Sequence, residues 1–135
     1  MKASISFLEI QKLLTDNIKQ TISLAFVNSK TMKVGYPLDL GFIKKDITAN
    51  LIIKKLDGTD LLLQLDAGFG SDTMATTIIN LIKGKAPDGL IEKHPDSHLL
   101  VHLGLIEQLK VVLDKIAVND LHVLVDGLEV EGQLK

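Results

Sequence analysis

The chain of 135 residues contains no cysteine and no tryptophan, and its 15 basic residues are all lysine. The absence of cysteine excludes disulfides, thiolate metal sites and a cysteine nucleophile. The absence of arginine removes the side chain that most often makes bidentate contacts with phosphates and bases. No stretch is rich in lysine, and the formal net charge is −2. We therefore expect no nucleic-acid partner.

Long apolar runs are missing as well. No segment approaches the roughly 18 consecutive apolar residues that mark a membrane-spanning helix. Near the N-terminus, Glu9, Gln11 and Lys12 interrupt any apolar stretch that could serve as a secretory signal. We therefore expect no transmembrane segment and a cytoplasmic location.

Hydrophobic residues make up 46% of the chain, but aromatic residues only 4%. Most of the hydrophobic residues are therefore aliphatic. The length fits one domain over residues 1–135. A chain of this size can bury a core without disulfides or metals. The surplus of Leu, Ile and Val predicts either a large core or apolar surface that is left for a ligand or a partner.

Apolar residues at helical spacing predict helices over 6–18, 71–83 and 105–116. Alternation of apolar and polar residues predicts β-hairpins over 22–36, 47–65 and 121–130.

Between these elements, Asp57-Gly58 and Asp126-Gly127 are typical turn dipeptides. Pro37 is expected to end the first hairpin, residues 84–97 to form a loop and residues 99–103 a short strand. The order is then α-ββ-ββ-α-α-ββ. It predicts an α+β fold in which an antiparallel sheet of about six strands, from three hairpins, packs against two to three helices.

Two segments, 6–36 and 105–135, have a similar pattern of a helix followed by a hairpin. Glu, Lys, Asp and Ile recur at equal spacing in their helices, as in Glu9 and Glu107. This predicts an internal repeat, but any two amphipathic helices share such patterns, so a chance likeness stays open.

Three histidines, His94, His98 and His102, follow one another at intervals of four residues. Because Pro95 argues against a helix here, we place His98 and His102 on one face of a strand and predict them as candidate metal ligands. The alternative is a pair of half-exposed histidines on an edge strand. His122 is interpreted as a sheet-surface histidine without a nameable partner, and Glu129 and Glu131 as solvated charges.

A glycine-containing loop, residues 66–72, leads from a strand into a helix and is compatible with anion binding or with an ordinary turn. It lacks the glycine and lysine pattern of a nucleotide-binding loop, so no cofactor is expected. Gly-x-Ser-x-Gly does not occur, and no pair of carboxylates stands out for acid–base chemistry. An enzyme is therefore disfavoured.

The aliphatic surplus is the one positive indication of function. Apolar side chains such as Ile52 and Leu62 fall on strand faces expected to be wet, which suggests a groove for an apolar ligand. The residues expected to line it are Phe26, Leu51, Leu63, Ile78 and Leu109.

The stretch 116–132, Ile-Ala-Val-Asn-Asp-Leu-His-Val-Leu-Val-Asp-Gly-Leu-Glu-Val-Glu-Gly, resembles half-units of the tubular lipid-binding superfamily. The resemblance covers the last third of the chain, and the first 36 residues if the repeat is real. It implies a curved antiparallel sheet that wraps a helix and holds acyl chains. No binding residue carries over, and the chain is short for a complete tube, so this reading requires a dimer or a one-unit variant.

Three functions follow from these observations. The first is non-catalytic binding of an apolar small molecule or lipid. The second is a protein-interaction module that forms a homodimer. The third is a small enzyme or metal-binding protein that uses His98 and His102.

Overall fold

The computed structural model describes residues 1–18, 21–39, 41–42, 44–66 and 71–135. Its helices and strands are β1 (Lys2–Ser6), α1 (Phe7–Ile18), β2 (Ser23–Asn28), β3 (Thr31–Asp39), β4 (Lys44–Asp57), β5 (Asp60–Asp66), α2 (Ser71–Lys85), β6 (Ile91–His94), β7 (His98–His102), the short 3-10 helix η1 (Leu103–Leu105), α3 (Glu107–Leu113), β8 (Ile116–Leu124) and β9 (Gly127–Leu134).

The predicted α+β class with antiparallel sheet is confirmed. In the described residues the strands form two sheets, a six-stranded one in the order β2-β3-β4-β5-β7-β6 and a three-stranded one in the order β1-β9-β8. All neighbouring strands are antiparallel. The predicted third hairpin, β8–β9, therefore belongs to a separate sheet, since β1 pairs with β9 and no strand of the larger sheet does.

The passage from β1 to α1 is fixed by a capping box. The Ser6 hydroxyl accepts a hydrogen bond from the Glu9 amide at 3.1 Å, and the Glu9 carboxylate accepts one from the Ser6 amide at 3.2 Å. These bonds satisfy two backbone N–H groups that helix formation leaves without partners. The helix consequently begins at Phe7, and the residues before it are free to pair as a strand with β9.

Pro37 does not end β3, contrary to expectation, because the strand continues to Asp39. The pairing of β3 with β2 stops at Gly35, whereas its pairing with β4 continues past Pro37, which lies opposite Asp46. Within the described residues Pro37 therefore has a strand neighbour on one side only, and a proline is tolerated where its missing N–H would face the unpaired side.

The predicted loop 84–97 contains a strand instead. Residues 91–94 form β6, which pairs with β7 and places His94 opposite His98. Asp96 and Ser97 reverse the chain with φ angles of 60° and 60°. Because the left-handed conformation is unusual for serine, this hairpin was not recognisable from its sequence.

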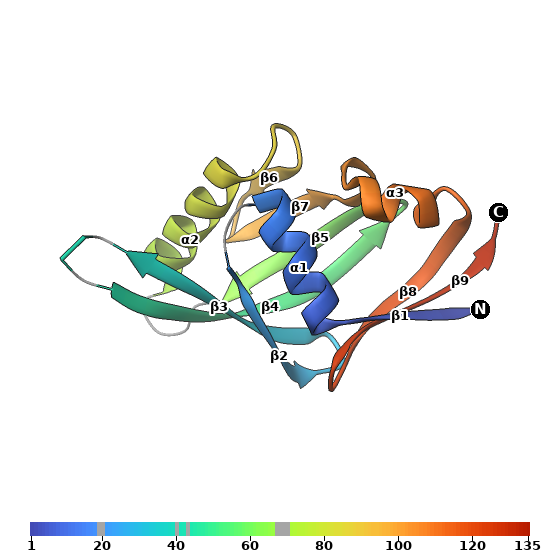
Figure 1. The fold of residues 1–135 in the computed structure, drawn as a ribbon, viewed down its shortest axis with the longest axis horizontal. Helices are drawn as coiled ribbons and strands as arrows, with labels where there is room; N and C mark the ends of the chain where they lie inside the picture. Colours follow the sequence, from blue (N-terminus) through green and yellow to red (C-terminus); the bar gives the residue numbers. More distant parts are fainter. Residues whose placement is uncertain (19–20, 40, 43, 67–70) are drawn as a thin grey trace.

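The larger sheet has a core face and an outer face. Figure 1 shows α1 in front of this sheet, where it crosses β4 and β5 in the view. On the core face, alternate residues of β5, namely Leu61, Leu63 and Leu65, are buried. Together with Ile78 and Ile79 of α2 they belong to one apolar cluster that extends into both sheets.

The two sheets meet at the turn between β2 and β3. The Ser29 carbonyl accepts a hydrogen bond from the Val123 amide at 2.8 Å, and the Lys30 carbonyl accepts one from the Ile53 amide at 2.7 Å. The Lys30 side chain crosses to β8 and donates to the Leu121 carbonyl at 2.6 Å. This turn therefore fixes the smaller sheet against the larger one.

A helix followed by a hairpin occurs at both positions of the predicted repeat, but β2–β3 lies in the larger sheet and β8–β9 in the smaller one. The repeat stays a prediction. Residues 67–70 of the glycine-containing loop lie outside the described residues. None of the described helices is long and apolar enough to cross a membrane.

Candidate metal centre

The smaller sheet has one apolar and one polar face. On β8, Leu121 and Val123 are buried against the core. Because side chains alternate along a strand, His122 between them points to the opposite face. The strand register places His122 directly across from Glu129, and Asp120 directly across from Glu131. Four ionisable side chains therefore share a small area on the outer face of one hairpin.

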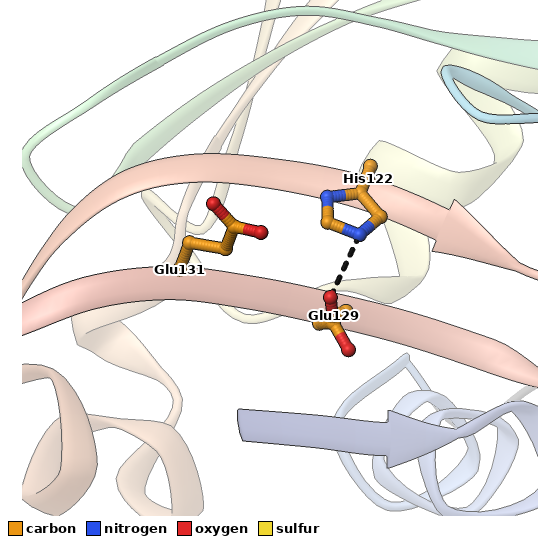
Figure 2. A group of neighbouring side chains, drawn as sticks. All are labelled: His122, Glu129 and Glu131. Atoms are coloured by element: carbon orange, nitrogen blue, oxygen red, sulfur yellow. Dashed lines mark hydrogen bonds and ion pairs between the residues drawn. The ribbon is translucent and has the colours of Figure 1, made fainter. Parts of the chain in front are cut away.

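Three of these side chains converge. The ligand atoms of His122, Glu129 and Glu131 all lie within 4.8 Å of one another, and within the described part of the chain this is the one such group of histidines and carboxylates. Nε2 of His122 lies 2.9 Å from Oε1 of Glu129. Figure 2 shows the imidazole and both carboxylates together on the two neighbouring strands. Since all three are half-buried, the positions are constrained by the sheet.

Asp120 holds the other side of the histidine ring. Its Oδ2 lies 3.5 Å from Nδ1 of His122, and its Oδ1 lies 2.9 Å from Nζ of Lys30. The hydrogen bond from Lys30 lowers the pKa of Asp120 from its ordinary value, so this carboxylate stays ionised. The other ring nitrogen, Nε2, faces Glu129, so both ring nitrogens of His122 lie next to carboxylates. An ion that displaced the proton on Nε2 would leave Nδ1–H to donate to Asp120, which is the usual arrangement around a metal-bound histidine.

The donor set identifies the class of ion that fits. One imidazole nitrogen and two carboxylate oxygens match zinc, manganese or ferrous iron better than calcium or magnesium, which prefer oxygen ligands alone. The two carboxylates would neutralise the charge of a divalent ion. Three protein ligands would leave coordination positions open to water or to another ligand.

One cation already lies close to the group. Nζ of Lys2, on β1, is 3.5 Å from Oε1 of Glu131, but its side chain is 67% exposed. Exposed ion pairs contribute little free energy. Lys2 is therefore a weak competitor for Glu131.

A second histidine group lies on the outer face of the larger sheet, because Asp60 and His102 alternate with buried residues of the core face. Nδ1 of His102 is 2.7 Å from Oδ1 of Asp60, and Nε2 forms a short contact with Oε2 of Glu92. These hydrogen bonds, with Asp60 the stronger influence, raise the pKa of His102 above its ordinary value. Because both ring nitrogens face carboxylates, the ring acts as a double donor in its protonated form. The carboxylates lie on opposite sides of the ring and do not converge on one point.

The structure places the predicted metal ligands His98 and His102 on the same strand but gives them different partners. Nδ1 of His98 lies 3.0 Å from the Pro95 carbonyl. Four residues along a strand span about 13 Å, so the two rings do not reach one ion. The grouping of donors favours His122 in their place.

Four of the five predicted ligand-lining residues belong to the core or pack against it. Leu63 and Ile78 are buried, and Leu51 and Leu109 are half-buried against the same cluster. Phe26 differs, because it is 42% exposed on the edge strand β2. Binding of an apolar ligand by these five residues stays a prediction.

Comparison with known proteins gives no relative. No family model, no curated protein and no solved structure matches the chain.

Proposed function

We propose that this domain binds a divalent transition-metal ion through His122, Glu129 and Glu131. The observation that carries the proposal is the convergence of three donor groups within 4.8 Å on one hairpin. The carboxylate of Asp120 beside Nδ1 of His122 supports it independently, because such a partner orients a metal-bound histidine.

A bound ion would replace the hydrogen bond between His122 and Glu129. Its positive charge would lie between two carboxylates that the sheet holds next to each other. The ion would cross-link β8 to β9, so that its binding free energy would add to the stability of the smaller sheet. Zinc is the ion we expect to bind most tightly, since it accepts imidazole and carboxylate ligands in a flexible geometry.

Isothermal titration calorimetry of chelator-treated protein with zinc, and separately with manganese, tests the proposal. We expect one ion per chain and a loss of affinity of at least about tenfold in His122→Gln and in Glu131→Gln. The matched controls are His98→Gln and Glu107→Gln, which remove a histidine and a carboxylate elsewhere and should bind as the unaltered protein does.

Two results would reject the proposal. One is the absence of binding at about 100 μM zinc, where even a weak site of this kind would fill. The other is equal loss of affinity in His98→Gln and His122→Gln, which would indicate adventitious binding by surface histidines. A second readout is thermal unfolding, whose midpoint should rise with zinc only in variants that retain His122.

A further inference from the structure

The edges of the two sheets differ in charge. The four edge strands are β1 and β8 of the smaller sheet, and β2 and β6 of the larger one. A free edge exposes unpaired N–H and C=O groups, and charged side chains are a common protection against unwanted pairing. Three of the edges contain them: Lys2 in β1, Glu92 and Lys93 in β6, and Asp120 in β8.

β2 is the exception. Its sequence, Ser-Leu-Ala-Phe-Val-Asn, contains no charge and no proline. Phe26 is 42% exposed and Val27 is 40% exposed. Among the described residues, no backbone hydrogen bond apart from the pairing with β3 reaches residues 23–27. An uncharged, apolar and unprotected edge of this kind is expected to be covered.

Two further exposed apolar side chains lie in segments near the β8–β9 turn. Val125, in the turn itself, is 77% exposed, and Leu8 at the start of α1 is 77% exposed. Backbone hydrogen bonds connect these segments: the Val123 amide donates to Ser29, and the Phe7 amide donates to Asp126. Figure 1 shows the β8–β9 turn beside the end of β2.

We propose that β2 pairs in antiparallel fashion with β2 of a second copy of this chain and joins two six-stranded sheets across a two-fold axis. Such an interface is self-complementary, because the same patch serves both partners. Of the possible pairings of β2 with an edge strand of a second copy, the one with β2 itself is favoured by the distribution of charge. β2 against β2 buries no charge, whereas β2 against any other edge would bring Lys2, Asp120, or Glu92 and Lys93 into the contact.

The apolar corner extends the contact beyond the strand. A pair of strands alone buries little surface, but Val125 lies in the turn beside the end of β2 and adds apolar area. This proposal is independent of the metal site, whose residues lie on the outer face of the smaller sheet.

Analytical ultracentrifugation in the presence of a chelator, over a range of protein concentrations, tests the dimer. The chelator excludes dimers bridged by metal ions. Val27→Lys places a charge on the edge and should weaken dimerisation by at least about tenfold, since a buried lysine without a partner is costly. Val111→Lys is the matched control, because Val111 is an exposed valine on α3 and its replacement should leave the dimer intact. A monomer at all concentrations, or equal behaviour of the two variants, would overturn the proposal.

Disulfide trapping tests the strand pairing itself. The chain has no cysteine, so a single introduced cysteine can form a disulfide only between two copies. Cysteines placed one at a time at positions 24, 25, 26 and 27 should include at least one that forms a dimer rapidly, since Cα atoms at the centre of an antiparallel pair lie within reach of a disulfide. Val111→Cys should not. If none of the four forms a disulfide-linked dimer faster than Val111→Cys, β2 is not the interface, even where ultracentrifugation detects a dimer.

Discussion

The ammonium of Lys30 lies 2.9 Å from the carboxylate of Asp120, and this ion pair connects the larger sheet to the smaller one. Lys30 occupies the β2–β3 turn and Asp120 the edge strand β8, so 90 residues of sequence separate them. The same ammonium donates to the Leu121 carbonyl. One lysine therefore positions both the sheet junction and the carboxylate that lies beside His122.

Replacing Lys30 with Met should loosen the junction without altering either sheet. Without the hydrogen bond from Lys30, the pKa of Asp120 should rise toward its ordinary value, and the Val123 amide should exchange faster because its bond to Ser29 depends on the same contact. NMR titration and amide hydrogen exchange measure the two effects. Lys33→Met, on exposed β3 surface nearby, is the control, and identical exchange at Val123 in both variants would contradict the role given to Lys30.

Stability should depend on pH through His102. Hydrogen bonds to Asp60 and then Glu92 raise its pKa above the ordinary value of 6.5, which also describes the unfolded chain. The native protein therefore binds the proton more tightly than the unfolded chain. This stabilisation is fully present below pH 6.5 and is lost as pH rises through the raised pKa.

Urea unfolding at intervals from about pH 6 to about pH 9 measures this dependence. The unfolding midpoint should fall across that range in the unaltered protein, and His102→Gln should remove most of the fall. His98→Gln, in the same strand but bonded to a carbonyl, should keep it. A fall that survives His102→Gln unchanged would assign the pH dependence to another group.

Much of the local structure could be predicted because it follows from short-range patterns. Alternation in residues 61–65 indicates both the strand and its buried face, and helical spacing identifies α1 and α2. β1 could not be found this way, since Lys2–Ser6 becomes a strand only by pairing with residues 127–131 at the far end of the chain. β6 was missed for a related reason. Pro95 and Asp96 are typical of loops, and residues 91–94 form a strand only because they pair with β7.

His98 and His102 were predicted from the sequence as metal ligands, although the position of His122 near a glutamate depends only on the local geometry of the last hairpin. The tight turn of the last hairpin has Val125 and Asp126 at its centre, which places His122 opposite Glu129. The turn expected from the sequence, with Asp126 and Gly127 at its centre, would instead place His122 opposite Glu131, so that expectation was wrong by one residue. Counting outward from the expected turn therefore gives a glutamate opposite His122, but not the observed one. The group of His102, Asp60 and Glu92 is different, because it depends on the pairing of β5 with β7, two strands separated by α2.

Two residues of the predicted ligand site, Leu63 in the core and Phe26 on an edge strand, should differ in how much their truncation lowers the free energy of unfolding. Leu63→Ala removes a side chain that is 5% exposed and should lower the free energy of unfolding by about 2–5 kcal/mol. Phe26→Ala, at 42% exposure, should lower it by less than about 1 kcal/mol. Both are measured by urea unfolding in a Val27→Lys background, so that dimerisation does not contribute. Equal losses would mean that Phe26 is buried in the monomer, contrary to its position on β2.

Glycine is needed at position 127 because the backbone of β1 leaves no room for a β-carbon, and not because of an unusual backbone conformation. A β-carbon at this position would lie 2.9 Å from the Cα of Ser6 and 2.9 Å from the carbonyl carbon of Ile5, both backbone atoms of β1. Backbone cannot rotate away as a side chain can, so Gly127→Ala must displace β1 from β9. We expect a loss of about 3 kcal/mol in the free energy of unfolding and rapid exchange of the amides of β1.

Gly84 provides the contrast, because it lies in α2 and a β-carbon there would meet nothing within 4 Å. Gly84→Ala should raise the free energy of unfolding by up to about 1 kcal/mol, since alanine loses less backbone entropy than glycine in a helix. The two substitutions add the same methyl group, so opposite signs in urea unfolding would show that contact with β1 determines the choice of glycine at position 127. If Gly127→Ala were neutral, the close pairing of β1 with β9 would be wrong, and with it the position of Lys2 next to Glu131.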